Sequence, residues 1–155
     1  MAQEPADDPR AIHQDLLDRT GKAYVIGDFD SFAACFLLPQ HVATHDGTRH
    51  LETRDDLRAM FASMRAFFAA RGATHLDRNN VAAEYTGEGT ISATHHSRLM
   101  AGDRVIQTAF PAHSILKRHD GAWKVAFSQY AVPDAAHSGA LGTLTDSHPT
   151  HGATE

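Results

Sequence analysis

Histidine is the side chain best placed for chemistry in this sequence, since twelve occur among 155 residues. The reference pKa of histidine is ~6.5, so an imidazole can take up or release a proton near neutral pH. Alternation along two predicted strands places polar and apolar residues on one face, in the sets His75-Asp77-Asn79-Val81 and Ile91-Ala93-His95-Ser97-Leu99. Such mixed faces could line a ligand cavity.

The spacing of the histidines argues against a metal site. His95 and His96 are adjacent in a predicted strand, where successive side chains point to opposite faces, so both cannot bind one ion without a bulge. His41, His45 and His50 form no helical i, i+4 pair, and the chain has no cysteine cluster. We therefore predict no native metal site, and we expect no cofactor.

Two other kinds of reactive site find no support. Asn79-Asn80 and Gly87-Glu88-Gly89 match neither a phosphate-binding loop nor a nucleophile elbow. Cys35 is the only cysteine, so no internal disulfide can form. It lies beside the apolar positions Phe32 and Phe36, which favours a buried thiol over a nucleophile.

Composition places the chain among globular proteins of one domain. Hydrophobic residues make up 42% and charged residues 21%, and the formal net charge of −5 offers no basic surface for nucleic acid. The longest apolar run, Phe32 to Leu38, is far shorter than the ~20 residues of a membrane helix. Met1 to Asp8 is acidic, unlike the start of a signal peptide. We expect a cytoplasmic protein without nucleic-acid or membrane partners.

Two helices are predicted at the start of the chain. Asp8 as a cap and Pro9 in the first turn predict a helix from residue 9, and Gly27 favours its end. Asp28 can cap a second helix, which we expect to continue to about Leu38. Its apolar residues recur at spacings of three and four: Phe29, Phe32, Ala33 and Phe36.

A third helix and a short hairpin complete the first half. Val42 to Asp46 is semi-alternating, and Asp46-Gly47 is a turn signal, so we predict a small strand or hairpin. Thr53 can cap a helix that ends at Gly72. Its apolar face consists of Leu57, Met60, Phe61, Met64, Phe67 and Phe68.

The second half of the chain favours β-structure. Glycine-containing turns separate four stretches, whose spacing suits antiparallel hairpins: 74–85, 90–100, 104–118 and 123–132. One face of such a sheet needs cover, and the three helices are the only candidates, so we predict an α+β domain. We place this domain at residues 10–132, after an extension over 1–9. The last segment, 133–155, contains His137, His148 and His151 but few apolar residues, so we expect it to be mobile.

The order of these elements resembles the SnoaL-like branch of the NTF2-like superfamily over roughly residues 10 to 132. The matching segments are Gly27-Asp28-Phe29-Asp30, His45-Asp46-Gly47, the helix from Arg54 to Phe68, and Asp120-Gly121-Ala122-Trp123-Lys124-Val125. The resemblance implies a cone in which three N-terminal helices pack on a curved, mostly antiparallel sheet around a cavity. Members include polyketide cyclases, ketosteroid isomerases and scytalone dehydratase, so the fold alone does not choose a reaction.

The resemblance also implies candidate catalytic residues. Asp46 falls close to the proton-abstracting aspartate of the ketosteroid isomerases, and His75 resembles a histidine that opens a strand in scytalone dehydratase. We hypothesise that Asp46 or His75 acts as a general base while Tyr24 and His95 orient a ligand oxygen. The further candidate ligand-binding residues are Asn79, His113 and Trp123.

Two functions from different classes follow from these residues. The first is a cofactor-free lyase, cyclase or isomerase that moves a proton in a small hydrophobic or polyketide-like molecule. The second is a noncatalytic domain that binds a ligand or a protein partner through the same cone or through the outer face of the sheet. In either case the outer face of the sheet needs cover, so we expect a homodimer through the sheet.

Overall fold

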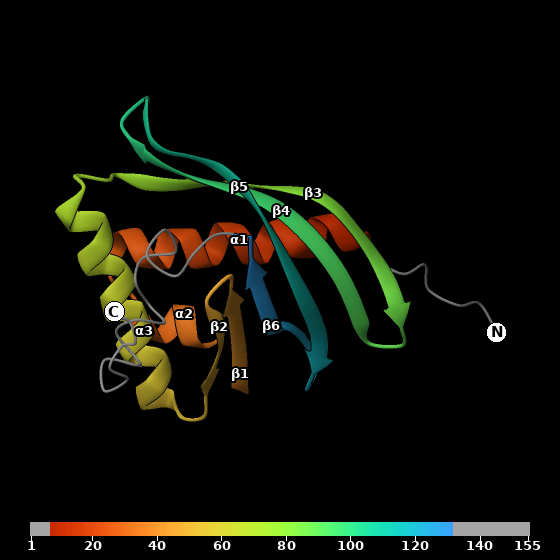
Figure 1. The fold of residues 1–155 in the computed structure, drawn as a ribbon. Coiled ribbons are helices and arrows are strands. Elements are labelled where there is room, and N and C mark those ends of the chain that lie inside the picture. The colour runs from red at the N-terminus through yellow and green to blue at the C-terminus, as the bar shows by residue number, and fades with distance from the viewer. Residues whose placement is uncertain (1–6, 132–155) are drawn as a thin grey trace.

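The computed structural model describes residues 7–131, which form helices packed on one curved sheet (Figure 1). In chain order the elements are α1 (Pro9–Ile26), α2 (Phe29–Ala33), β1 (Phe36–Thr44), β2 (Gly47–Leu51), α3 (Arg54–Ala70), β3 (His75–Gly87), β4 (Thr90–Ala101), β5 (Arg104–His119) and β6 (Ala122–Tyr130). The predicted α+β architecture is confirmed. The segment 133–155, for which we predicted mobility, lies outside the described residues.

Helix α1 begins and ends where the sequence predicts. The Asp8 carboxylate accepts a hydrogen bond from the backbone N–H of Arg10 at 3.0 Å, and Pro9 occupies the first turn. At the other end Gly27 has a φ of 78° and donates its N–H to the carbonyl of Ala23. A Cβ at this glycine would also lie 2.8 Å from Arg65 Nη1, so a larger residue would have to displace the Arg65 guanidinium in addition to adopting the positive φ.

The second helix is shorter than predicted. It ends at Ala33, and Phe36, which the helical spacing placed on the same apolar stripe, begins β1 instead. Strand β1 pairs with the last strand, with Phe36 opposite Val125. The prediction was wrong because the spacing of residues within one segment carries no information about a pairing strand in a distant part of the chain. Here that tertiary pairing overrides the local helix propensity.

The third helix is confirmed, with its predicted start. Thr53 and Asp56 form a capping box, in which the Thr53 hydroxyl accepts from the Asp56 N–H and the Asp56 carboxylate accepts from the Thr53 N–H. The two acidic residues of the first turn favour the positive end of the helix dipole.

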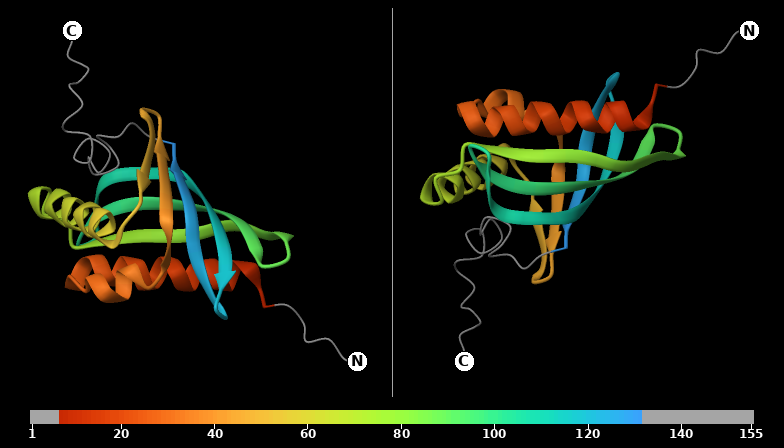
Figure 2. Two further views of the ribbon diagram at one scale, coloured as in Figure 1. Left: turned by 90° about the horizontal axis from the view of Figure 1, so that it is seen from below. Right: turned by 90° about the horizontal axis from the view of Figure 1, so that it is seen from above.

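The strands of residues 7–131 belong to one sheet of order β2-β1-β6-β5-β4-β3. Its strand pairs are antiparallel except β1 with β6, which is parallel. The predicted hairpin at Asp46-Gly47 is therefore part of the main sheet. Helix α1 runs alongside β3 in both views of Figure 2, which places its buried side chains against β3 and β4.

The buried face of the sheet, here called the inner face, carries the core. On β4 it presents Ile91, Ala93, His95, Ser97 and Leu99, the set predicted by alternation. Aromatic rings from all three helices meet beside it, with Tyr24 at 4.7 Å from Phe32 and 5.3 Å from Phe61, between ring centroids. The aromatic core thus packs around Tyr24, near the C-terminal end of α1. The more N-terminal turns of α1 lie over the part of the inner face that carries the polar residues His95 and Ser97.

Replacing Gly21 by alanine should stabilise the domain. Gly21 lies inside α1, and a Cβ there would meet no atom within 4 Å. Because glycine loses more backbone entropy than alanine in a helix, we expect a gain of about 0.5–1 kcal/mol. Urea unfolding followed by circular dichroism measures it.

Gly72→Ala provides the matched control for that change. Its Cβ would also meet nothing within 4 Å, but its φ is +66°. We therefore expect this second variant to lose stability. Equal effects of the two substitutions would contradict the argument.

Candidate functional site

Polar side chains gather on the inner face between α1, β3 and β4. We call His13, Arg78, Asn80 and His95 the interior polar cluster. Asn80 lies opposite His95 in the β3–β4 ladder, and Arg78 lies opposite Ser97 two residues along the same face. His13 comes from the second turn of α1, which packs on these strands. Helix and sheet together therefore position the cluster.

The two histidines of the cluster are buried side by side. Each is 1% exposed, and their ring centroids are 5.3 Å apart. Asn80 Nδ2 lies 2.8 Å from His13 Nδ1 and 3.1 Å from the carbonyl oxygen of Ala82, so the amide group donates to both. The His13 Nδ1 atom then accepts, and the proton of the neutral ring lies on Nε2.

Three ring nitrogens of these histidines are left without a partner. Within residues 7–131, neither His13 Nε2 nor the Nδ1 and Nε2 atoms of His95 meet a hydrogen-bonding group. Buried polar atoms are nearly always paired in native proteins, and an unpaired one costs about 1–3 kcal/mol. The cluster therefore presents unused donors and acceptors to whatever lies beside it.

Both imidazoles are neutral at physiological pH. Burial, together with smaller effects of the charges of Arg78 and His113, lowers the pKa of His13 to about 4. Burial likewise lowers the pKa of His95 to about 2, together with Arg78, His13 and His96. A general base works best when its pKa is near the working pH, so these rings suit hydrogen bonding better than proton abstraction.

Arg78 connects the cluster to α1. Its Nη2 atom donates to the carbonyl oxygen of Leu17 at 2.9 Å and to the hydroxyl of Thr20. Gln14 ties the same strand to the helix, because it donates to the carbonyl of Arg78 and accepts from the N–H of Asn80. The guanidinium Nε is buried and has no partner within the described part of the chain.

A surface cleft of about 310 Å³ lies between α1 and β3. Gly21, Leu76 and Arg78 contribute to its wall, and His75 lies at the same edge. Arg78 therefore borders this cleft as well as belonging to the interior polar cluster. His75 itself is exposed, and its Nδ1 atom lies 2.9 Å from the hydroxyl of Thr74.

The structure brings two of the predicted site residues to the inner side, Tyr24 and His95. Tyr24 is 5% exposed, and its ring stacks on Phe61. Burial raises the pKa of Tyr24, with a further rise from Tyr130 and an opposing effect of Arg78, so the phenol is neutral. The Arg78 charge thus acts on both residues.

The other predicted site residues are not brought to that place. His75 and Asn79 are exposed on the outer side of β3, and Asp46 is exposed at the β1–β2 turn. His113 lies on the outer side of β5, with Nε2 3.3 Å from the Ser92 hydroxyl. Asp46, His75 and His95 therefore do not converge on one point.

Trp123 lines a different cleft, of about 460 Å³, beside the N-terminal half of α1. Its ring centroid lies 6.0 Å from that of Tyr85, and the Arg118 guanidinium lies 5.9 Å from the Trp123 ring. Trp123 also packs against the smaller core cluster that includes Leu16 and Cys35. This place agrees with core packing as much as with contact to a ligand.

Sequence reasoning missed His13, Arg78 and Asn80, although signals for them exist. His13 and Thr20 extend the buried face of α1 with Leu16, Leu17 and Tyr24, at helical spacings. Arg78 and Asn80 occupy the alternate positions of β3. The prediction took the face of β3 that carries His75 to line the cavity, so it left these two residues out.

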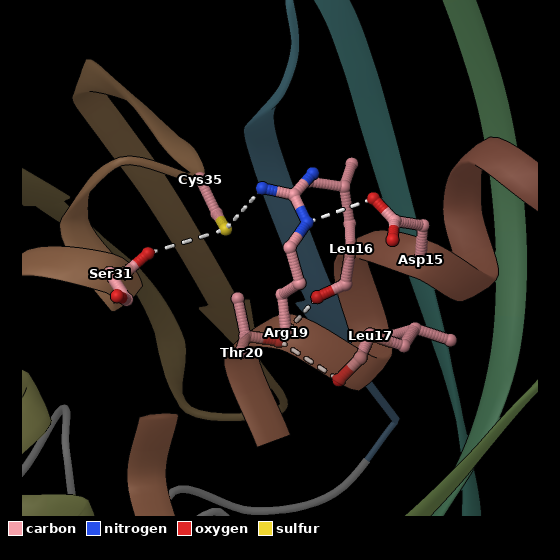
Figure 3. A network of polar contacts seen from close by, with 7 residues as sticks. All are labelled: Asp15, Leu16, Leu17, Arg19, Thr20, Ser31 and Cys35. Atoms are coloured by element: carbon pink, nitrogen blue, oxygen red, sulfur yellow. Dashed lines mark hydrogen bonds and ion pairs between the residues drawn. The ribbon is translucent and has the colours of Figure 1, made fainter. Parts of the chain in front are cut away.

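Cys35 belongs to a separate network on another side of α1 (Figure 3). Its thiol is fully buried, contacts the Ser31 carbonyl at 3.5 Å, and lies 3.6 Å from Arg19 Nη1. Arg19 in turn pairs with Asp15 at 2.8 Å. Burial raises the pKa of the thiol, so the predicted packed cysteine is confirmed.

Within residues 7–131, no three side chains of histidine, cysteine, aspartate or glutamate come together as ligands for one metal ion. In the same residues no helix has the length and apolar character needed to cross a bilayer.

A helix-covered curved sheet with polar groups on its inner face defines the class of NTF2-like α+β domains. The chain belongs to one family of that class, described as NTF2-like protein (DUF6841), whose sequence profile matches residues 10–131. No curated protein matches the chain.

Solved structures share the fold at low sequence identity. The protein Aln2 from a Streptomyces species superposes with a TM-score of 0.66 at 17% identity, over 88% of this chain and 99% of that one. A protein of unknown function with a cystatin-like fold from Nostoc punctiforme gives 0.65 at 16%, over 84% and 96%. An NTF2-like protein of unknown function from Shewanella oneidensis gives 0.62 at 11%, over 80% and 99%. These likenesses show the fold alone.

Proposed function

We propose that this protein binds a small organic molecule through the interior polar cluster. The observation that carries the proposal is the set of unpartnered nitrogens on His13 and His95, two side chains that are each 1% exposed. A ligand oxygen or nitrogen would satisfy them and offset the cost of their burial. Apolar residues share the buried faces that carry the two histidines, Leu16 on α1 and Ala93 on β4, so the rest of the ligand should be largely hydrophobic, as in polyketide-like molecules.

The hydrogen-bond network indicates which group does what. Because Asn80 occupies His13 Nδ1, the His13 Nε2–H can donate to a ligand oxygen. His95 is neutral, so one of its ring nitrogens donates and the other accepts. Tyr24 and its hydroxyl would contribute at the aromatic side of the site. This arrangement orients a ligand without needing a cofactor.

A cofactor-free lyase, isomerase or cyclase is the second candidate. The observation that favours it is that the unpartnered His13 Nε2–H belongs to a ring within electrostatic reach of Arg78, since donors and cations of this kind polarise a carbonyl and stabilise an enolate. Proton abstraction would then fall to His95, whose pKa of about 2 is low for that role. Binding is therefore the function that the geometry supports best.

We also retain two proposals from the sequence. A second copy of the chain could cover the outer side of the sheet, where Val81 is 53% exposed and Phe127 and Ile115 are half-buried. A cytoplasmic location fits a chain with one buried cysteine and no possible internal disulfide.

Adjacent histidines allow a sharp test of binding. His95 faces inward and His96 faces outward, so His95→Leu and His96→Leu change the same residue type on opposite faces. With 2-naphthol as the probe, calorimetric titration should show binding at least about tenfold weaker for His95→Leu, which corresponds to the loss of a hydrogen bond. His96→Leu should bind like the unchanged protein. Equal affinities for all three proteins would overturn the proposal.

A further inference from the structure

Arg78 is a cation held next to buried groups with no carboxylate to balance it. Its bonds within residues 7–131 go to two neutral oxygens, the Leu17 carbonyl and the Thr20 hydroxyl. No carboxylate of those residues lies within ion-pair distance of the guanidinium. The guanidinium group of an arginine carries several N–H donors, arranged in a fork that suits a carboxylate or another anion. The N–H donors of Arg78 that make neither of these two bonds could therefore bind an anion.

The nearby acidic residues of α1 are committed elsewhere. Asp15 pairs with Arg19 at 2.8 Å, and Asp18 accepts from Gln14 Nε2 at 2.9 Å. Asp77, one residue before Arg78, faces the outer side and pairs with Arg98. Two of these three carboxylates therefore pair with other arginines, and Asp18, which lines the same cleft as Arg78, forms no ion pair with it.

The titratable groups that share the interior with Arg78 are neutral as well. Burial keeps His13 and His95 unprotonated, and it keeps the Tyr24 phenol protonated. The Arg78 charge acts on all three of them. A positive charge in partly desolvated surroundings without a compensating anion is costly, and an anion bound beside it reduces that cost.

We infer that the ligand of the interior polar cluster carries an anionic oxygen, a carboxylate or an enolate, which Arg78 binds. The inference rests on the function proposed above and names its ligand class. His13, on the helix that packs over this strand, is close enough to Arg78 for the two to interact electrostatically, and its unpartnered Nε2–H provides a second donor to that anion. The apolar body of the ligand then lies on the side of the buried core. Arg78 is thus a specificity-determining residue that separates acids from their neutral analogues.

Two isosteric probes test the inference, 2-naphthoate and 2-naphthamide at pH 7.5. The unchanged protein should bind the carboxylate at least about tenfold more tightly, as a charge-assisted hydrogen bond implies. Arg78→Gln should remove this preference mainly by weakening 2-naphthoate. Arg98→Gln is the matched control, because Arg98 is an arginine of the neighbouring strand whose partner is Asp77 on the outer side. It should leave the preference unchanged.

A second variant covers the case in which Arg78→Gln fails to fold. Arg78→Lys keeps the positive charge but has no fork, so it should retain a preference for the carboxylate while binding it more weakly. Acetate serves as the probe for the anion alone. Competition by acetate as strong as that by 2-naphthoate would show an adventitious ion only and would overturn the inference.

The outcomes separate this inference from the proposed function. If both naphthyl probes bind with equal affinity and His95→Leu weakens both, the binding function stands and the role of Arg78 is wrong. If neither probe depends on His95, the proposed function itself fails. Only a carboxylate preference that disappears in Arg78→Gln and persists in Arg98→Gln supports the inference.

Discussion

Acidification from pH 7.5 to pH 5.5 should lower the free energy of unfolding of this domain by about 2.5 kcal/mol. His13 and His95 have folded-state pKa values of about 4 and about 2, below the ~6.5 of an unfolded chain. Below pH 6.5 the unfolded state therefore binds more protons than the folded state, and stability falls. Each histidine contributes a loss of about 1.3 kcal/mol over this range.

Urea unfolding at half-unit pH steps measures this loss. This pH range lies above the one in which carboxylates affect stability. Hydrogen bonds from Ser31 lower the pKa of Asp28, and a hydrogen bond from Arg98 lowers that of Asp77. These two carboxylates therefore lose their stabilising effect only as the pH falls below about 4. His95→Leu should show about half of the decrease, and His96→Leu nearly all of it. A stability that stays flat between pH 7.5 and 5.5 in the unchanged protein would show that the two imidazoles are not buried as described.

Much of the fold follows from local signals in the sequence. Caps at Asp8 and Thr53 and the stop at Gly27 depend on a few neighbouring residues, and the structure confirms all three. The alternation over β4 also predicted the inner face, because a two-residue period is fixed by strand geometry. The parallel pairing of β1 with β6 could not be predicted in this way, since it joins segments far apart in the chain.

The candidate site was predictable only in part, for a reason that β3 illustrates. One residue of register decides whether His75 and Asn79 or Arg78 and Asn80 face inward, and both pairs are polar. The apolar residues of β3 did not settle the choice, because Leu76 lies on one alternate set and Val81 on the other. A register shift between Asn80 and Ala82 further breaks the alternation. His95 was found because apolar neighbours flank it in the alternating pattern of β4.

Replacing His95 by leucine should stabilise the domain while it removes ligand binding. Leucine has a similar size, and it leaves no ring nitrogens without partners in a place that is 1% exposed. Removing two buried, unsatisfied polar atoms should raise the free energy of unfolding by roughly 1–3 kcal/mol at pH 7.5. At pH 5.5 the advantage should increase by about 1.3 kcal/mol more, because the variant lacks the imidazole that takes up a proton in the unfolded chain but stays unprotonated in the folded one.

His96→Leu distinguishes this effect from a general gain in hydrophobicity. His96 is exposed on the outer side of the same strand, so its replacement should change stability by less than about 0.5 kcal/mol. Urea unfolding of both variants, beside titration with 2-naphthol, gives the two quantities together. A His95→Leu protein that is less stable than the unchanged one would mean that protein groups or water already satisfy the ring. A more stable protein that no longer binds would show that His95 weakens the fold in exchange for a function.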